Sequence, residues 1–194
     1  MNGDKQCQRR LARERRGGLD RGQRAEYSLE ICRRICAMPE LRGARLALSY
    51  MAVGDEADLA PLHVMLLEKG LRLAFPLTLD GGKMEARIAG ENNFRPGRFG
   101  LMEPDPEKTA PVGPGDIDIV LTPCLAFDES CARLGHGAGY YDRYLPQCKK
   151  ALFIAAAFEA QKLPQIACTE LDVKMHAVAT EKEIYRAPFP LGAR

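Results

Sequence analysis

A long apolar run that leads directly into a glycine-rich loop is the feature that most constrains this fold. Residues 117–127 are mostly Ile, Val, Leu, Ala and Phe, as expected for a strand buried on both faces. The loop that follows has glycines at alternate positions, Gly135, Gly137 and Gly139. Glycine permits positive φ angles and close backbone approach, so the N–H groups of such a loop can surround one anion. The preceding Arg133 adds a planar positive group, and open α/β sheets bind ligands at this strand-to-loop position.

The loop does not follow the standard nucleotide-binding patterns. It lacks the Gly-Lys-Ser/Thr ending of a P-loop, and its glycine spacing is not that of a dinucleotide fingerprint. A helix that begins near Gly139 would direct its N-terminus at the same anion. Glycine spacing alone leaves open a plain tight turn between a strand and a helix.

The rest of the chain alternates between strand and helix patterns, which predicts an α/β fold. We expect a three-layer structure, with a largely parallel open sheet and helices on both faces. The expected helices are residues 4–17, 20–37 and 57–69, and the expected strands are residues 45–52, 71–79, 83–89, 117–127, 151–158 and 177–184.

Residues 90–115, rich in Gly and Pro, are expected to form a long functional loop. Residues 1–186 are expected to form a single domain, and residues 187–194 a flexible tail.

Composition narrows the class of protein. No window approaches 18 uninterrupted apolar residues and the N-terminus is polar, so we expect no membrane association, no secretion signal and a cytoplasmic location. The seven cysteines, an odd number without a C-x-x-C pair, predict reduced thiols. Cys32 is expected to be buried, and Cys131 would be reactive if it were exposed. We expect a monomer.

Basic residues are concentrated in residues 5–24, although the net charge is only +2. Lys5, Arg9, Arg13 and Arg16 are spaced to share one face of a helix. Such a face is open to several interpretations: it can be merely solvated, it can bind nucleic acid, or it can form part of an anion site. Interspersed acidic residues argue against a transit peptide.

Residues 118–145 resemble the signature of the 5-formyltetrahydrofolate cyclo-ligase family, also called 5,10-methenyltetrahydrofolate synthetase. The family pattern reads roughly D-L-V-L-V-P-G-L-A-F-D, a short spacer, then R-L-G-Y-G-G-G-Y-Y-D-R-x-L. Three other segments agree in order: Lys5 and Arg9 at K-x-x-x-R spacing, residues 54–58, and residues 97–104. The resemblance extends from about residue 5 to about residue 183. The chain departs from the pattern at Leu59, Cys124, His136 and Ala138.

The resemblance implies an enzyme that uses ATP and Mg²⁺ to convert 5-formyltetrahydrofolate into 5,10-methenyltetrahydrofolate. It implies catalytic roles for Arg133 and Tyr140, and Mg²⁺ binding by Asp142 and Asp172. The implied ATP-binding residues are Lys5, Arg9, Arg133, Leu134, Gly135, His136, Gly137, Ala138, Gly139, Tyr140 and Tyr141. The implied folate-binding residues are Glu56, Met84, Phe99, His136, Gly137, Ala138, Gly139 and Tyr140.

Each of these roles has a structural alternative. Asp142 could cap its own helix, and Glu56 could be a helix N-terminal charge before Ala57. Packing in the core is the alternative for Met84, Phe99 and Tyr141, and it is the expected role of His63 and His176.

Two other functions remain open from the sequence. One is a nucleic-acid-binding module that uses the basic N-terminal helix, although that would leave the glycine loop and both aspartates unexplained. The other is a different phosphate-ligand enzyme on the same scaffold, because a fold does not fix a function. Between these classes we favour the folate enzyme, with no nucleic-acid partner.

Overall fold

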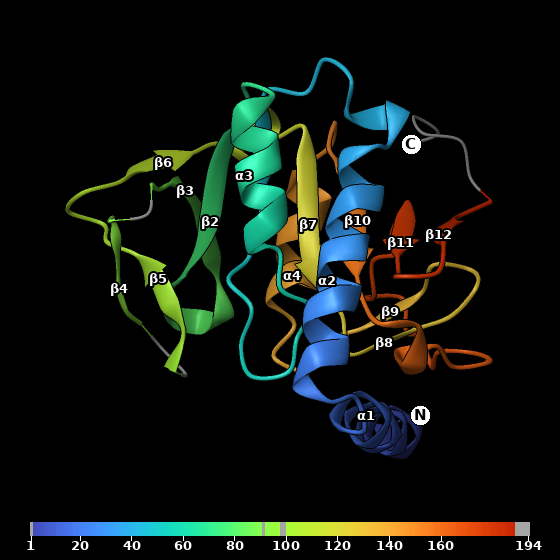
Figure 1. Ribbon diagram of the computed structural model, residues 1–194. Helices are drawn as coiled ribbons and strands as arrows, with labels where there is room; N and C mark the ends of the chain where they lie inside the picture. Colours follow the sequence, from blue (N-terminus) through green and yellow to red (C-terminus); the bar gives the residue numbers. More distant parts are fainter. Residues whose placement is uncertain (1, 91, 98–99, 189–194) are drawn as a thin grey trace.

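The computed structural model describes residues 2–90, 92–97 and 100–188, and its centre is an eight-stranded sheet (Figure 1). The strand order is β12-β11-β10-β7-β1-β2-β3-β6. The central strands are parallel: β1 (Leu46–Leu48), β2 (Arg72–Thr78), β7 (Ile119–Pro123), β10 (Leu152–Ala156) and β11 (Ala177–Ala179). The strands at the two edges are antiparallel to their neighbours: β3 (Met84–Ile88), β6 (Ala110–Val112) and β12 (Ile184–Arg186).

Helices cover both faces of this sheet, as predicted. The helices α2 (Arg21–Cys36) and α3 (Ala60–Glu68) pack on one face, and the short α4 (Tyr140–Tyr144) packs on the other (Figure 1). Alternate residues of β1 show the two layers, because Ala47 packs in the core cluster under α2 and α3, whereas Leu46 and Leu48 pack in the opposite cluster. The three-layer α/β prediction is confirmed.

The helix α1 (Asn2–Gly17) crosses the end of the sheet at which the parallel strands terminate (Figure 1). A capping box between Asp20 and Gln23 starts α2 directly after it. The chain therefore turns sharply at residues 18–20, so that α1 lies across the carboxyl ends of the strands while α2 runs along the sheet.

The segment predicted as a long loop, residues 90–115, contains three short strands instead. They are β4 (Phe94–Pro96), β5 (Met102–Pro104) and β6, and β6 extends the main sheet. Each of these strands contains a proline. Proline is confined to edge positions of sheets because it cannot donate to the ladder, so its frequency here favoured a loop prediction.

Other boundaries also differ from the predictions. The strand expected at 45–52 is only β1, and α3 begins at Ala60, later than the predicted residue 57. The run 117–127 leaves the main sheet after Pro123 and continues as β8 (Ala126–Phe127), which pairs with β9 (Arg133–Leu134). The run 177–184 similarly divides between β11 and β12. Most of the predicted tail, residues 189–194, lies outside the described residues.

All seven cysteines are free, as expected, and Cys32 is buried. Cys131 is also buried, and burial raises the pKa of its thiol to about 11, so the exposure on which its reactivity would depend is not present. In the described part of the chain, no helix combines the length and the apolar character needed to cross a membrane.

Candidate functional site

The inward face of α1 carries cations on either side of one alanine. Ala12 is fully buried against the β8–β9 hairpin, and this small side chain lets the helix approach closely. Lys5, Arg9 and Arg16 lie on the same face, whereas Arg13 is exposed. The expectation that all four cations share one face was therefore wrong for Arg13. At about 100° per residue, the positions seven and eleven residues after Lys5 return to within about 20° of it, but the eighth is displaced by about 80°.

Lys5 forms an ion pair with Asp172, with 2.5 Å between Nζ and Oδ2. The same carboxylate accepts hydrogen bonds from the backbone N–H and the hydroxyl of Thr169, at 2.5 and 2.9 Å. Partial burial acts to raise the pKa of Asp172, but the hydrogen bonds from Lys5 and Thr169 outweigh it and hold the pKa below its ordinary value. Asp172 is therefore a carboxylate oriented toward the N-terminal helix.

Arg9 connects the same helix to the glycine loop, because its Nε donates to the carbonyl oxygen of Gly135 at 2.9 Å. Gly137 and Gly139 have positive φ angles of 114° and 69°, which glycine adopts without strain. Gly135 is needed for space instead, since a Cβ there would lie 3.3 Å from Nη1 of Arg133. The alternating glycines thus allow the backbone to turn closely around two arginines.

The helix after the loop, α4, is short, so its N-terminus has only a small helix dipole. It starts at Tyr140, near the predicted Gly139, but spans only residues 140–144. Arg143 donates to the carbonyl oxygens of Gly82 and Ala138, and its guanidinium lies 5.6 Å from the ring centroid of Tyr140. Side-chain contacts, more than a helix dipole, hold this end of the loop.

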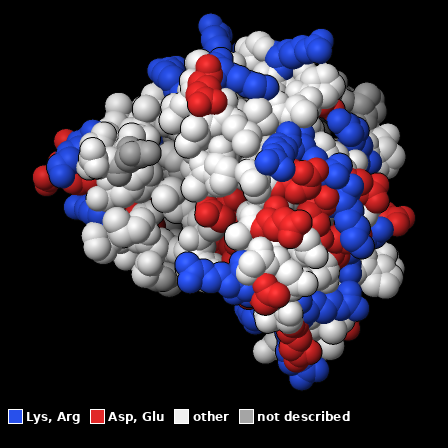
Figure 2. All heavy atoms as spheres, viewed as in Figure 1, with Lys and Arg blue, Asp and Glu red and all other residues white. Residues whose placement is uncertain are grey.

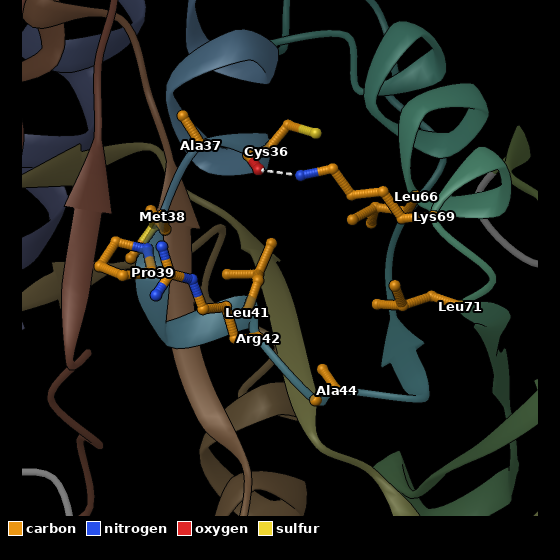
Figure 3. A pocket seen from close by; sticks show the side chains of 11 residues that line it. Cys36, Ala37, Met38, Pro39, Leu41, Arg42, Ala44, Leu66, Lys69 and Leu71 are labelled. Carbon is orange, nitrogen blue, oxygen red and sulfur yellow. Dashed lines mark hydrogen bonds between the residues drawn. The ribbon is translucent and has the colours of Figure 1, made fainter.

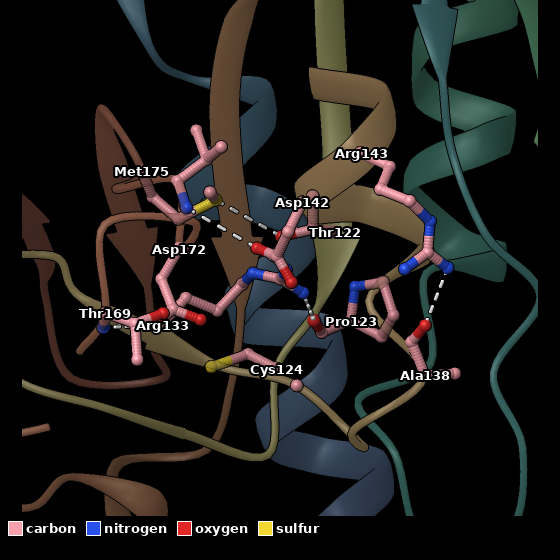
Figure 4. A network of polar contacts seen from close by, with 12 residues as sticks. Thr122, Pro123, Cys124, Arg133, Ala138, Asp142, Arg143, Thr169, Asp172 and Met175 are labelled. Carbon is pink, nitrogen blue, oxygen red and sulfur yellow. Dashed lines mark hydrogen bonds and ion pairs between the residues drawn. The ribbon is translucent and has the colours of Figure 1, made fainter. Parts of the chain in front are cut away.

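Arg133 lies beneath the loop, and only 3% of its side chain is exposed. Its Nη2 contacts Oδ1 of Asp142 at 3.2 Å, and its Nη1 donates to the carbonyl oxygen of Pro123 at 3.1 Å (Figure 4). The backbone N–H of Val173 reaches the same Asp142 oxygen at 3.5 Å. These bonds turn the carboxylate away from the first-turn amides of α4, so helix capping does not account for Asp142. They also bring Asp142 beside the segment that carries Asp172.

The ring of Tyr141 packs against this arginine, 5.5 Å from the guanidinium carbon. Its hydroxyl group is buried, and within the described residues it has no hydrogen-bond partner. Burial raises the pKa of Tyr141 far above its ordinary value, so the phenol stays protonated. Tyr141 therefore offers a neutral O–H group under the loop.

Glu56 faces the glycine loop from the turn after β1. Its Oε1 is hydrogen-bonded to Nε2 of His136 at 2.8 Å, and its Oε2 accepts from the backbone N–H of Val53 at 3.0 Å. Because α3 begins only at Ala60, a helix N-terminal charge does not account for this carboxylate. Only 11% of the Glu56 side chain is exposed, whereas 42% of the His136 side chain that contacts it is exposed.

Several predicted residues lie apart from these polar contacts. The side chains of Met84 and Leu134 are buried in core clusters, and Phe99 lies outside the described residues. His63 is hydrogen-bonded to the buried Ser49 hydroxyl at 2.7 Å, and His176 accepts from the backbone N–H of Phe153.

Two hollows on the surface of the described residues lie away from these polar contacts. A pocket of about 370 Å³ lies at the end of the sheet opposite the glycine loop, between the C-terminal ends of α2 and α3 (Figure 3). A shallower one, of about 430 Å³, lies on the outer face of α1 and is lined by Arg10 and Arg13. At the glycine loop, two ion pairs each join a cation to a carboxylate.

The carboxylates of this edge limit how a metal ion could bind. In residues 2–90, 92–97 and 100–188, no group of three or more His, Cys, Asp and Glu side chains is arranged to hold an ion. A cation held by Asp142 and Asp172 would take its other ligands from water or from a bound phosphate, which suits Mg²⁺. The donors available are oxygen atoms, so the site fits this metal.

Some contacts near the glycine loop were not predicted from the sequence. Thr169 orients Asp172, Arg143 ties the loop to the 80–82 turn, and Arg16 pairs with Asp55 at 2.5 Å. Of these residues, only Arg16 could have been assigned to the site from the sequence, because it lies eleven residues after Lys5 on a helix and so shares its face. Arg143 and Gly82 are distant in sequence, whereas Thr169 lies only three residues before Asp172.

In both sequence and structure, the chain is similar to proteins of one enzyme family. Residues 1–181 match the profile of the 5-formyltetrahydrofolate cyclo-ligase family. The 5-formyltetrahydrofolate cyclo-ligase of Mycolicibacterium smegmatis is 35% identical over 71% of this chain and 74% of its own length. The Escherichia coli K12 protein of the same name is 26% identical over 90% of this chain and 99% of its own. An NMR structure of Aquifex aeolicus 5,10-methenyltetrahydrofolate synthetase covers 98% of this chain and 96% of its own, with a TM-score of 0.83 at 27% identity.

Proposed function

The chain belongs to the 5-formyltetrahydrofolate cyclo-ligase family, and from this premise we propose that it converts 5-formyltetrahydrofolate into 5,10-methenyltetrahydrofolate with ATP and Mg²⁺. The proposal rests on one observation: two ion pairs, Lys5–Asp172 and Arg133–Asp142, lie at the same end of the sheet. They join the N-terminal helix, the glycine loop and the segment after residue 168 into one polar site, as a nucleotide and a metal ion would require.

The proposed chemistry solves a leaving-group problem. A formamide oxygen leaves poorly, so the γ-phosphoryl group of ATP is first transferred to it, and ADP is released. The N10 nitrogen then attacks the formyl carbon, the carbon–oxygen bond breaks, and phosphate departs with the former formyl oxygen while N10 loses its proton. Such a route needs positioning and charge neutralisation more than a covalent protein nucleophile.

The cations of the site would neutralise the transferred phosphoryl group. Lys5 and Arg9 would contact the phosphates from α1, and Arg133 would contact the γ-phosphoryl oxygens from beneath the loop. Residues 134–141 would surround the triphosphate with loop amides and with the Tyr140 and Tyr141 side chains. Tyr140, which is partly buried with its ring against Arg143, would also contact the folate.

Asp142 and Asp172 would hold Mg²⁺. The bound ion would neutralise charge on the β- and γ-phosphates. Both carboxylates are paired with cations, so binding requires an exchange in which Lys5 and Arg133 turn to the phosphates as the aspartates turn to the metal. ATP and Mg²⁺ should therefore bind as one unit.

Glu56 would receive the folate at its pterin edge, whose N–H groups are suitable donors for a carboxylate. His136 occupies one oxygen of Glu56 and would have to release it. The backbone of Gly137, Ala138 and Gly139 would complete the folate contacts, with Phe99 as the proposed apolar contact. The side chain of Met84 packs in the core instead.

The test is to measure ADP release and the ultraviolet absorbance of the methenyl product with and without 5-formyltetrahydrofolate. We expect ADP release to require the folate, ATP and Mg²⁺ together, and to match product formation one to one. ATP hydrolysis that is unaffected by the folate would contradict the proposal. Arg13→Ala, on the exposed face of α1, is the control and should behave like the wild type.

A nucleic-acid-binding module is less well supported. Lys5, Arg9 and Arg16 face the protein interior, where they contact Asp172, Gly135 and Asp55. On the face shown in Figure 2, blue and red side chains are intermixed, whereas a duplex would require a continuous basic stripe.

We also propose that the enzyme acts as a monomer in the cytoplasm, for which its seven free thiols are suited.

A further inference from the structure

Arg16 is a buried cation to which neither the sequence nor the proposed reaction assigns a task. It lies in the last turn of α1, and only 6% of its side chain is exposed. Its Nη2 is 2.5 Å from Oδ1 of Asp55, in the turn that follows β1. The charge also lies near Cys124, although burial dominates there and raises the pKa of that thiol to about 12.

The guanidinium of Arg16 is only partly satisfied. Its Nε and Nη1 are buried and, within the described residues, have no hydrogen-bond partner. Unpaired buried donors are costly, and a buried ion pair is often replaced by apolar side chains of similar volume without loss of stability. Stability alone therefore gives a weak reason for an arginine at this position.

Asp55 is the neighbour of Glu56, so Arg16 holds the backbone from which Glu56 projects. Other contacts fix the same turn: the Val53 N–H donates to Oε2 of Glu56 at 3.0 Å, the Glu56 N–H donates to the Val53 carbonyl oxygen at 3.3 Å, and His136 contacts Oε1. Arg16 is the contact that connects this turn to α1, the helix whose other inward cations are Lys5 and Arg9.

We propose that Arg16 is a positioning residue that acts through Asp55 to fix the carboxylate of Glu56. In this role it couples the helix on the ATP side of the site to the turn on the folate side. The inference rests on the proposed function for its kinetic consequences, but the geometric part concerns only the turn and can be measured without substrate.

The first test is amide hydrogen exchange of Val53 in the wild type, Arg16→Met and Asp55→Asn. Because the Val53 N–H is bound by the Glu56 carboxylate, its exchange reports whether that carboxylate is held. We expect about tenfold faster exchange in both variants, and no change in the control Arg13→Met. Unchanged Val53 exchange in folded Asp55→Asn would overturn the proposal even if Arg16→Met failed to fold, and this outcome does not depend on enzyme activity.

The second test is kinetic. Arg16→Met and Asp55→Asn should each raise the KM for 5-formyltetrahydrofolate about tenfold while changing the KM for ATP much less. Adding Glu56→Gln to Arg16→Met should cost little beyond Glu56→Gln alone, because both changes act on one carboxylate. Arg16→Lys keeps the positive charge, so its KM for 5-formyltetrahydrofolate should lie between those of the wild type and Arg16→Met.

The two tests separate the possible failures. A wild type without folate-dependent ADP release would contradict the proposed function and leave the exchange result standing. Additive effects of Arg16→Met and Glu56→Gln, or a rise confined to the KM for ATP, would overturn the positioning role instead.

Discussion

Lys5 and Asp172 are 167 residues apart in the chain, yet their side chains meet at 2.5 Å in an ion pair. The contact joins the first helix to a loop within the connection between the parallel strands β10 and β11. Hydrogen bonds from Thr169 hold the same carboxylate, so the pair is oriented from both sides. Any ligand that binds here must exchange partners with both members of the pair.

The double variant Lys5→Ala/Arg9→Ala is expected to raise the KM for ATP well above its effect on the KM for folate, because the lost contacts lie on the nucleotide side. Steady-state kinetics with each substrate varied in turn checks this. Affinity for DNA or RNA should be weak and its salt dependence unchanged by the variant. An unaltered ATP dependence together with a reduced salt slope for nucleic acid would instead favour the nucleic-acid-binding module.

Arg133→Ala should reduce kcat by about 30-fold or more, which corresponds to about 2 to 4 kcal/mol of lost transition-state stabilisation. The reason is the removal of a fixed cation beneath the glycine loop, where only 3% of the side chain is exposed. Because the change also leaves Asp142 without its partner, circular dichroism must show a folded protein, and Arg133→Lys provides a second variant. Near wild-type turnover at saturating ATP would rule out the assigned role.

Asp142→Asn and Asp172→Asn should each increase the Mg²⁺ concentration needed for half-maximal activity. An amide keeps the shape of the side chain but removes the charge that attracts the ion. Activity titrated with Mg²⁺ at fixed ATP checks this, with the exposed Asp116→Asn as the control. If both variants are folded and titrate like the wild type, these aspartates do not bind the metal.

Acid should destabilise the fold partly through His63. Burial lowers the pKa of this imidazole from 6.5 to about 4, so the unfolded chain binds a proton between these pH values and the folded protein does not. Stability is therefore retained above about pH 6.5 and lost as the pH falls toward 4, by about 1 kcal/mol or more. His63→Gln should flatten this part of a urea-unfolding series. A wild-type slope in the variant would assign the acid sensitivity elsewhere.

Local sequence patterns were sufficient to predict the elements that are formed by residues close together in the chain. The apolar run into alternating glycines predicted the strand and the loop after it, and the spacing of Lys5 and Arg9 predicted a shared helix face. The helix predicted over residues 20–37 agrees with α2, which spans Arg21–Cys36, to within one residue at each end. Such signals depend on helix period and turn chemistry, which act over a few residues.

The tertiary structure decided which side chains meet. Helical spacing places Arg16 within about 20° of Lys5 and Arg13 about 80° away. Which side of α1 docks, and therefore that Arg16 is buried against Asp55 while Arg13 is exposed, depends on the hairpin that receives Ala12. The strand β6 within residues 90–115 likewise forms where β3 offers an unpaired edge, a property of the sheet and not of those residues. A pair such as Lys5 with Asp172 depends on how separate segments converge at the carboxyl ends of parallel strands. That convergence is set by packing and sheet order across the whole chain, so no local pattern encodes it.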